Sequence, residues 1–147
     1  MAIQIKTLDE LKTMRRAGLL VGQTLDLLRQ SIKVGMRTDA LDAIAAANIK
    51  RGGGTSNFLG YHGYPATICI SVNDEIVHGI PGDRIIEDGD VVSIDCGAII
   101  EGWHGDAAFS FGAGTVDPAD QKMMDVCEES MWRGFAAAKL GGRLTDI

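Results

Sequence analysis

Two aspartates occupy neighbouring runs in which apolar residues alternate with small or polar ones. Asp95 lies in the run 91–100 and Asp106 in the run 103–112, with Glu101 and Gly102 between them. Such alternation predicts two β-strands, and the residues between them predict a hairpin turn. If the loop has an even number of residues, odd positions of the first strand pair with even positions of the second. Both carboxylates are therefore expected on one face of the hairpin, opposite its apolar face.

Carboxylates on a strand face are most simply explained as part of a solvent-exposed polar surface. Two observations favour a metal site instead. No Lys or Arg occurs between residues 91 and 112, so the two negative charges have no compensating cation within the hairpin. Their neighbours on the same face, Ser93, Gly97 and Ala108, are small and leave space above the strands. Closely spaced oxygen ligands in such a space suit a divalent metal ion, so the pair is predicted to form the floor of a cleft.

A second hairpin is predicted just before this one. Residues 66–72 alternate as a strand does, the Asn73–Asp74 pair suits a turn, and residues 75–79 would form the return strand. With a two-residue loop, Cys69 would lie opposite His78. A cysteine beside a histidine can act as a nucleophile, but no orienting acid or oxyanion motif accompanies this pair. His78 is better suited to contact a ligand by hydrogen bonding.

Three helices are predicted to form the scaffold. The first covers residues 8–30 behind a capping box that starts at Thr7, the second runs from Thr38 to just before Gly52, and the third begins at Pro118. Apolar residues recur at helical spacing in each, which predicts one buried stripe per helix. The stripes consist of Leu8, Leu11, Met14, Gly18, Val21, Leu25 and Leu28 in the first helix, Leu41, Ile44, Ala45 and Ile49 in the second, and Met124, Cys127, Met131, Phe135 and Ala138 in the third.

Composition limits the functional classes. The chain of 147 residues has a formal net charge of −6 and a pI near 4.9, which argues against a nucleic-acid partner bound through its phosphates. No apolar run reaches the length of a membrane span, so no membrane partner is expected. The three cysteines are odd in number and lack zinc-site spacing, which predicts reduced thiols and a cytoplasmic protein.

The end of the chain echoes an earlier joint between two helices. Residues 33–39 (KVGMRTD) resemble residues 139–146 (KLGGRLTD), and a long predicted helix precedes each. We therefore expect a first pseudo-repeat at about residues 1–116 and the start of a second at about residues 117–147. A helix-start pattern directly before the last residue also predicts that a second half belongs behind it.

Together, these motifs resemble type I methionine aminopeptidases of the short bacterial form. The resemblance covers nearly the whole chain and depends on FLGYHGYP at 58–65, HGIP at 78–81, SIDCG at 93–97 and GWHGD at 102–106. It implies an α+β architecture, half of a pita-bread (creatinase/aminopeptidase) fold in which helices pack on a curved, largely antiparallel sheet. Residues 1–147 would be the N-terminal part of the catalytic domain.

The resemblance also implies roles for single residues. Asp95 would bind one metal through both of its oxygens, and Asp106 would bridge two metals. His78 would be a catalytic and substrate-binding residue that hydrogen-bonds near the scissile amide. Asn73 lies near a position associated with a monovalent cation in some members, and His104 is not a ligand in this pattern. The residues that would line the pocket for the methionine side chain are Tyr61, Tyr64 and Cys69.

The implied reaction removes the initiator methionine from nascent polypeptide N-termini whose second residue is small. A dinuclear centre of divalent ions, whether cobalt, manganese, iron or zinc, would activate a water for attack on the peptide carbonyl. The resemblance assigns one His and two Glu ligands to a C-terminal half that this sequence lacks. We therefore expect the chain to be inactive by itself, to have that half as its partner and, without it, to expose apolar surface and self-associate.

Two alternatives remain open. A non-catalytic peptide-binding or partner-binding module of the same fold would not need a metal site, although such relatives typically lose the two metal acids that this chain keeps. An aminopeptidase or dipeptidase that acts at proline would share the fold, but the YHGYP motif at 61–65 favours the methionine branch.

Overall fold

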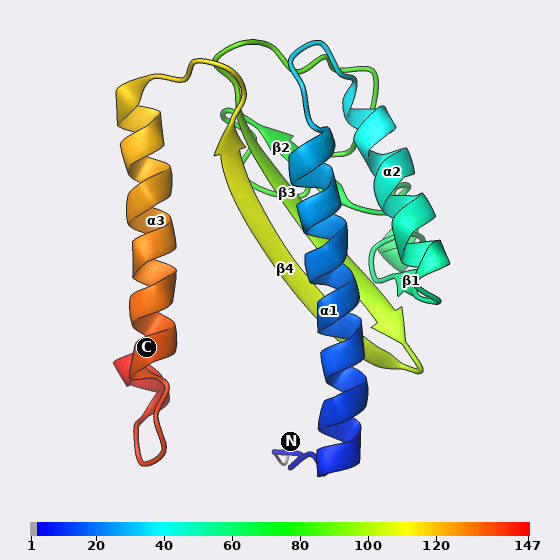
Figure 1. Ribbon diagram of the computed structural model, residues 1–147, viewed down its shortest axis with the longest axis vertical. Helices are drawn as coiled ribbons and strands as arrows, with labels where there is room; N and C mark the ends of the chain where they lie inside the picture. Colours follow the sequence, from blue (N-terminus) through cyan, green and yellow to red (C-terminus); the bar gives the residue numbers. More distant parts are fainter. Residues whose placement is uncertain (1–2) are drawn as a thin grey trace.

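The computed structural model describes residues 3–147, in which three long helices accompany a four-stranded antiparallel sheet (Figure 1). The predicted α+β class is confirmed. In chain order the elements are α1 (Leu8–Ser31), α2 (Thr38–Arg51), β1 (Thr55–Ser56), a 3₁₀ turn (Tyr61–Gly63), β2 (Cys69–Val72), β3 (Val91–Ile100), β4 (Trp103–Gly112), α3 (Pro118–Ala137) and a last 3₁₀ turn (Leu144–Asp146).

Strand β3 is the centre of the sheet. β4 pairs with it along its whole length, with Ile94 opposite Phe109, while β1 and β2 pair with two parts of its other edge. Glu101 and Gly102 connect β3 to β4 and have φ values of 51° and 80°, as the tightest hairpin turns require. The predicted hairpin is confirmed, and the register brings the apolar side chains of both strands to one face.

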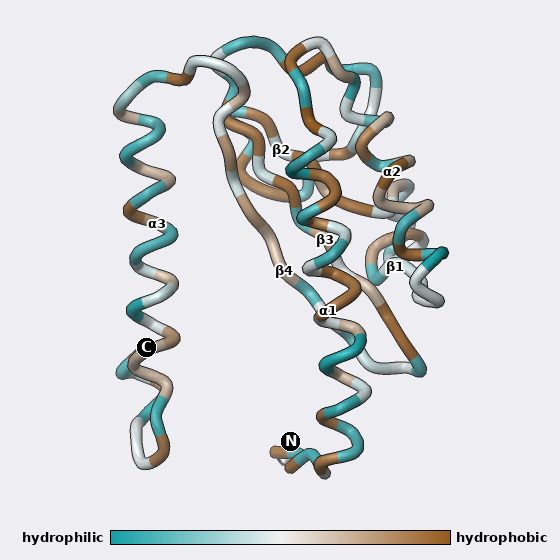
Figure 2. The backbone as a smooth tube through the Cα atoms, viewed as in Figure 1, coloured by the Kyte–Doolittle hydropathy of each residue, from teal (hydrophilic) through white to brown (hydrophobic). Residues whose placement is uncertain are grey.

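Helices α1 and α2 lie on this apolar face and enclose the core (Figure 1). Figure 2 shows hydrophobic residues gathered in β2, β3 and the neighbouring parts of the two helices. Gly105 permits the close approach of α1 to β4, because a Cβ atom there would lie 2.5 Å from the backbone nitrogen of Gly18. The largest fully buried side chains are Leu28, Leu41, Ile49, Ile68, Ile70, Ile86 and Ile94.

The predicted extents of the first two helices are confirmed, but one stripe is shorter than predicted. The capping box of Thr7 and Glu10 starts α1, and Val21, Leu25 and Leu28 are buried as expected. Leu8 and Leu11 are exposed, because the first turns of α1 extend beyond the end of the sheet (Figure 1). Within residues 3–147, no helix is both long enough and apolar enough to cross a membrane.

Helix α3 begins as predicted, with Asp117 as its N-cap and Pro118 as its first residue, but its predicted buried stripe is wrong. None of its residues is buried, and the exposed side chains include Met131 and Phe135. The helix stands beside β4 instead of packing on the sheet (Figure 1).

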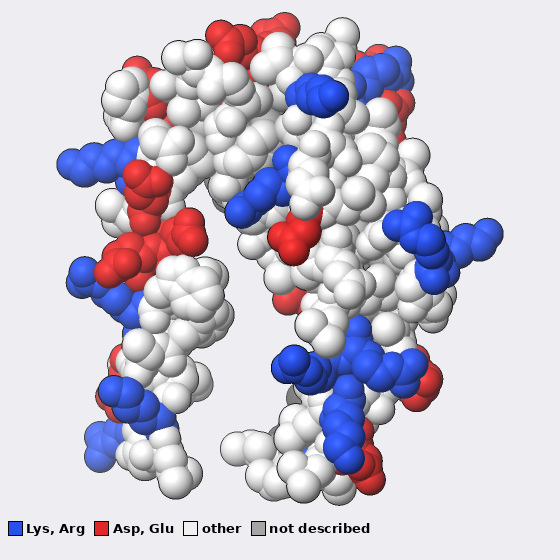
Figure 3. All heavy atoms as spheres, in the orientation of Figure 1, with Lys and Arg blue, Asp and Glu red and all other residues white. Residues whose placement is uncertain are grey.

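A groove of about 1010 Å³, here named the α3 groove, separates this helix from the sheet. Figure 3 shows the hollow between α3 and the rest of the molecule. The lining of the groove includes Phe109, Phe111, Met124, Cys127, Met131 and Trp132. The predicted stripe of α3 thus faces open space across from two aromatic residues of β4.

Candidate metal centre

Asp95 and Asp106 lie on the sheet face that α1 does not cover. Asp95 is paired with Ala108 and Asp106 with Gly97, so the two acids are diagonal neighbours on adjacent strands. The register therefore places both carboxylates on one face, as the alternation predicts. Asp95 is half-buried and Asp106 is exposed. That this face forms the floor of a cleft remains a prediction.

The charged form of Asp95 is disfavoured at this position. Burial raises the pKa of its carboxyl group, the nearby charge of Asp106 raises that pKa further, and His78 acts in the opposite direction. No Lys or Arg within residues 3–147 forms a salt bridge with either aspartate. A divalent cation would offset this repulsion, so the chemistry of the pair fits a metal ion.

The predicted return strand after β2 does not form, and the predicted pairing of Cys69 with His78 is wrong. On its β3 edge, Cys69 pairs with Asp95, and its other edge has no paired strand within residues 3–147. Residues 75–79 form no strand, and of residues 76–79 only Gly79 shares a backbone hydrogen bond with β2, through its carbonyl and the Ile70 amide. Side chains take the places that ladder bonds of a return strand would fill: the Val72 amide donates to Glu75 Oε2 at 2.9 Å, and the Gly79 amide donates to Ser71 Oγ at 3.1 Å. The alternation of side chains could not indicate this.

His78 still lies close enough to Asp95 to influence its carboxyl group. Its φ of 60° is in the left-handed region, which is uncommon for a residue with a side chain. The next residue, Gly79, packs against β2: its carbonyl accepts a hydrogen bond from the Ile70 amide at 2.9 Å. A Cβ atom on Gly79 would lie 2.1 Å from the Ile70 oxygen, so only glycine fits there.

The three predicted pocket residues have different surroundings. Cys69 is buried; burial raises the pKa of its thiol, the neighbouring Tyr64 hydroxyl opposes that effect, and the charge of Asp95 adds to it. Tyr64 is half-buried, and burial likewise raises the pKa of its hydroxyl. Tyr61 is 67% exposed in the 3₁₀ turn. Tyr64 and Cys69 thus adjoin the acid pair, and a protonated Cys69 thiol does not suit a nucleophile.

Two polar residues near the site are not among those predicted. Asp42 of α2 accepts hydrogen bonds from the backbone amides of Thr67 and Ile68, at 2.8 and 2.9 Å. Asn57 covers Gly97, where a Cβ atom would lie 2.6 Å from its Nδ2, and so fills the space that the small residue leaves. Neither has a sequence signature, because the partners of both belong to distant segments.

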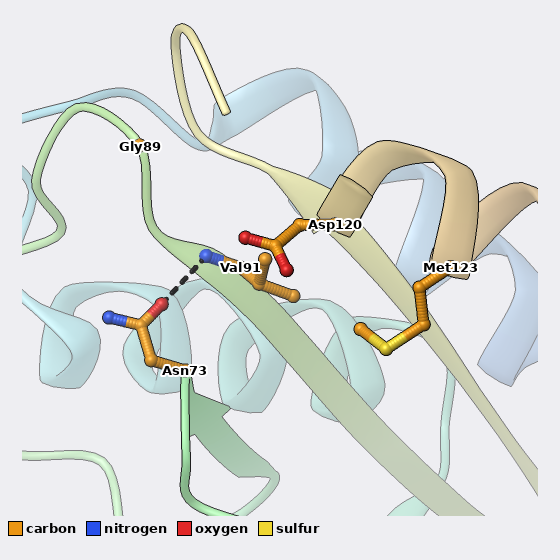
Figure 4. Close-up of a pocket in the computed structure, with 5 residues that line it drawn as sticks. All are labelled: Asn73, Gly89, Val91, Asp120 and Met123. Atoms are coloured by element: carbon orange, nitrogen blue, oxygen red, sulfur yellow. Dashed lines mark hydrogen bonds between the residues drawn. The ribbon is translucent and has the colours of Figure 1, made fainter. Parts of the chain in front are cut away.

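Asn73, which is predicted to lie near a monovalent-cation position, already makes two side-chain hydrogen bonds. Its Oδ1 accepts from the Val91 amide at 2.9 Å, and its Nδ2 donates to Asp90 at 2.8 Å. Figure 4 shows Asn73 and Val91 beside Asp120 and Met123 of α3, around a cavity of about 370 Å³. A cation there would need backbone carbonyls or the Asp120 carboxylate as ligands.

The described residues supply only part of a metal-binding site. Among residues 3–147, no three His, Cys, Asp or Glu side chains come close enough together to hold a metal ion. Two carboxylates leave most of about six ligand positions to water or to other protein groups. The acid pair fits a metal ion as one side of a larger donor set.

Known proteins share this arrangement of helices and strands. Metallopeptidase family M24 matches residues 12–147 of the chain. The chain belongs to this family. An M24 relative, the methionine aminopeptidase of Clostridium perfringens (strain 13 / Type A), is 43% identical over 145 residues, which are 99% of this chain and 58% of the relative. The predicted resemblance to methionine aminopeptidases is confirmed.

Solved structures agree with the M24 assignment. The methionine aminopeptidase of Rickettsia prowazekii matches with a TM-score of 0.88 at 32% identity, over 90% of this chain and 54% of that one. The prolidase of Pyrococcus furiosus matches with a TM-score of 0.75 at 20% identity, over 88% of this chain and 37% of that one, which shows a common fold alone. The predicted half of a pita-bread fold is confirmed. The chain spans slightly more than half the length of the methionine aminopeptidases that it matches.

Proposed function

We propose that this chain provides the N-terminal part of a metallo-aminopeptidase that removes the initiator methionine from nascent proteins with a small second residue. The observation that supports this most directly is the register of β3 and β4, which brings Asp95 and Asp106 to one open face. The names of the relatives supply the substrate class.

In this proposal Asp95 and Asp106 hold two divalent metal ions, whether cobalt, manganese, iron or zinc. Such ions, when bound, lower the pKa of a water molecule and polarise the peptide carbonyl. His78, which lowers the pKa of the Asp95 carboxyl group, hydrogen-bonds the substrate near the scissile amide. Tyr64 and Cys69 adjoin the acids and line the methionine pocket with Tyr61, and a monovalent cation binds near Asn73.

The remaining ligands, one His and two Glu, come from a C-terminal half in this proposal. The exposed apolar side chains of α3, among them Val126 (58% exposed) and Phe135 (60%), support such a partner, because monomers seldom leave apolar faces uncovered. The α3 groove offers the space into which that half would pack (Figure 3). The division into pseudo-repeats at about residues 1–116 and 117–147 remains a prediction.

Complementation tests the proposal. The chain is co-expressed with the remaining part of the Clostridium perfringens relative, and hydrolysis of a Met-Ala peptide is measured with Mn²⁺ or Co²⁺. We expect metal-dependent hydrolysis that Asp95→Asn and Asp106→Asn abolish, whereas Asp26→Asn, an exposed acid on α1, leaves it unchanged. A stable complex without hydrolysis would overturn the proposal, and the chain alone is expected to be inactive.

A peptide-binding module without catalysis is the second candidate. One observation favours it, the α3 groove, whose apolar and aromatic lining suits an apolar peptide segment. Calorimetric titration of the complemented protein with Mn²⁺ separates the two candidates, since the module predicts no tight divalent site.

A further inference from the structure

Asp42 joins helix α2 to the segment that leads into β2. A single oxygen, Oδ1, accepts hydrogen bonds from two consecutive backbone amides, those of Thr67 (2.8 Å) and Ile68 (2.9 Å). The carboxylate is half-buried, so water competes weakly for this contact. Asp42 thereby fixes the backbone that directly precedes Cys69.

The Tyr64 hydroxyl connects that segment to the residue after His78. It lies 3.1 Å from the Ile68 carbonyl oxygen and 3.0 Å from the Gly79 carbonyl oxygen, and its single proton is shared between them. Gly79 is also held through its amide, which donates to Ser71 Oγ at 3.1 Å.

His78 depends on these contacts for its conformation. Its φ of 60° is unfavourable for a residue with a side chain, and such a conformation persists only when the surroundings enforce it. His78 itself is exposed, so the contacts that hold its neighbour Gly79 are the ones that can enforce this conformation.

We propose that Asp42 is a positioning residue that acts through Tyr64 and Gly79 to hold His78 beside the acid pair. The role of His78 toward substrate rests on the proposed function. The hydrogen-bonded connection itself does not, so the two can fail separately.

Two substitutions of Asp42 separate the effect of its hydrogen-bond acceptor from the effect of its negative charge. Asp42→Asn keeps one carbonyl oxygen that can accept both amides, whereas Asp42→Ala keeps none. Tyr64→Phe breaks the connection at its second step. Asn48→Ala is the matched control. Asn48 lies on the same helix as Asp42, but its buried hydrogen bond (2.9 Å) goes to Thr24 of α1 and not to the segment before β2.

Hydrogen exchange of the 147-residue chain measures the connection without requiring activity. We expect Asp42→Ala and Tyr64→Phe to accelerate exchange at the Ile70 and Gly79 amides by about tenfold to hundredfold, with α1 unchanged. Asp42→Asn should stay close to the original chain, and Asn48→Ala should not affect Gly79 selectively. Unchanged exchange at Gly79, a uniform increase throughout the chain, or an Asp42→Asn result equal to that of Asp42→Ala would each overturn the proposal.

Kinetics of the complemented enzyme measure the consequence for His78. We expect Asp42→Ala to lower kcat more than it changes KM, and Asp42→Asn to restore kcat. Full activity of Asp42→Ala would overturn the positioning role. If the unsubstituted complex is inactive, the proposed function fails, while the exchange results still decide whether Asp42 positions the backbone at His78.

Discussion

Asp95 illustrates at the scale of one residue how the proposed metal site would lower the stability of the fold when no metal is bound. Its carboxyl group is half-buried beside Asp106, and both burial and the second charge raise its pKa. The pair is predictable from alternation alone, because strand geometry fixes which side chains share a face. The position of His78 cannot be predicted from alternation, because it depends on left-handed backbone at two residues of an irregular segment, Asn73 and His78 itself.

Replacing Asp106 by Asn should therefore have opposite effects with and without metal. Without metal, loss of the like charge should raise the free energy of unfolding by about 0.2–1 kcal/mol. With Mn²⁺ the complemented variant should be the less stable protein, because it binds the ion more weakly. Thermal melting in EDTA and in Mn²⁺ measures both, and the same order of stability under both conditions would contradict the prediction.

Asp42 should make stability depend on pH. Burial raises the pKa of its carboxyl group above the ordinary value, and the two backbone hydrogen bonds only partly oppose that effect. The folded state therefore binds a proton more readily than the unfolded chain, so ionised Asp42 lowers stability above its folded pKa, and this loss disappears as the pH falls. Asp42→Asn should be the more stable form at about pH 7 by urea unfolding, and its advantage should shrink toward acid pH. An advantage that grows in acid would contradict this.

At the scale of elements, local rules locate the helices well. The capping box at Thr7 and the Asp117–Pro118 start both form as predicted. The predicted stripe of α3 is wrong because helical spacing shows which residues share a face but not whether another element covers it. The return strand fails for a similar reason: alternation at 75–79 does not show that the side chains of Glu75 and Ser71 bond the backbone amides of Val72 and Gly79.

The packing of α1 on β4 yields a test with a matched pair of glycines. Gly105→Ala should lower the free energy of unfolding by about 1–3 kcal/mol, because its Cβ would collide with the α1 backbone. Gly22→Ala, in open space on α1, should raise it by about 0.5–1 kcal/mol. Urea unfolding measures both, and equal effects would show that α1 does not contact β4 as described.

At the scale of the whole molecule, the uncovered apolar side of α3 should make the isolated chain self-associate. Trp132 lines the α3 groove and is 56% exposed. Trp132→Glu should shift sedimentation toward monomer, whereas Ser130→Glu, which adds the same charge at an exposed position that is not among the groove residues, should not. A sharp monomer boundary for the unsubstituted chain would refute the prediction.

The three cysteines differ in a way that matters for handling the purified chain. Cys69 and Cys96 are buried, and burial raises the pKa of Cys96 to about 12, whereas Cys127 is exposed and lines the α3 groove. Air should therefore oxidise the Cys127 thiol, and two copies that meet along α3 would form a disulfide bond between their Cys127 residues. A reducing buffer would keep such preparations free of crosslinks, and the same thiol offers a single point for attaching a fluorescent dye.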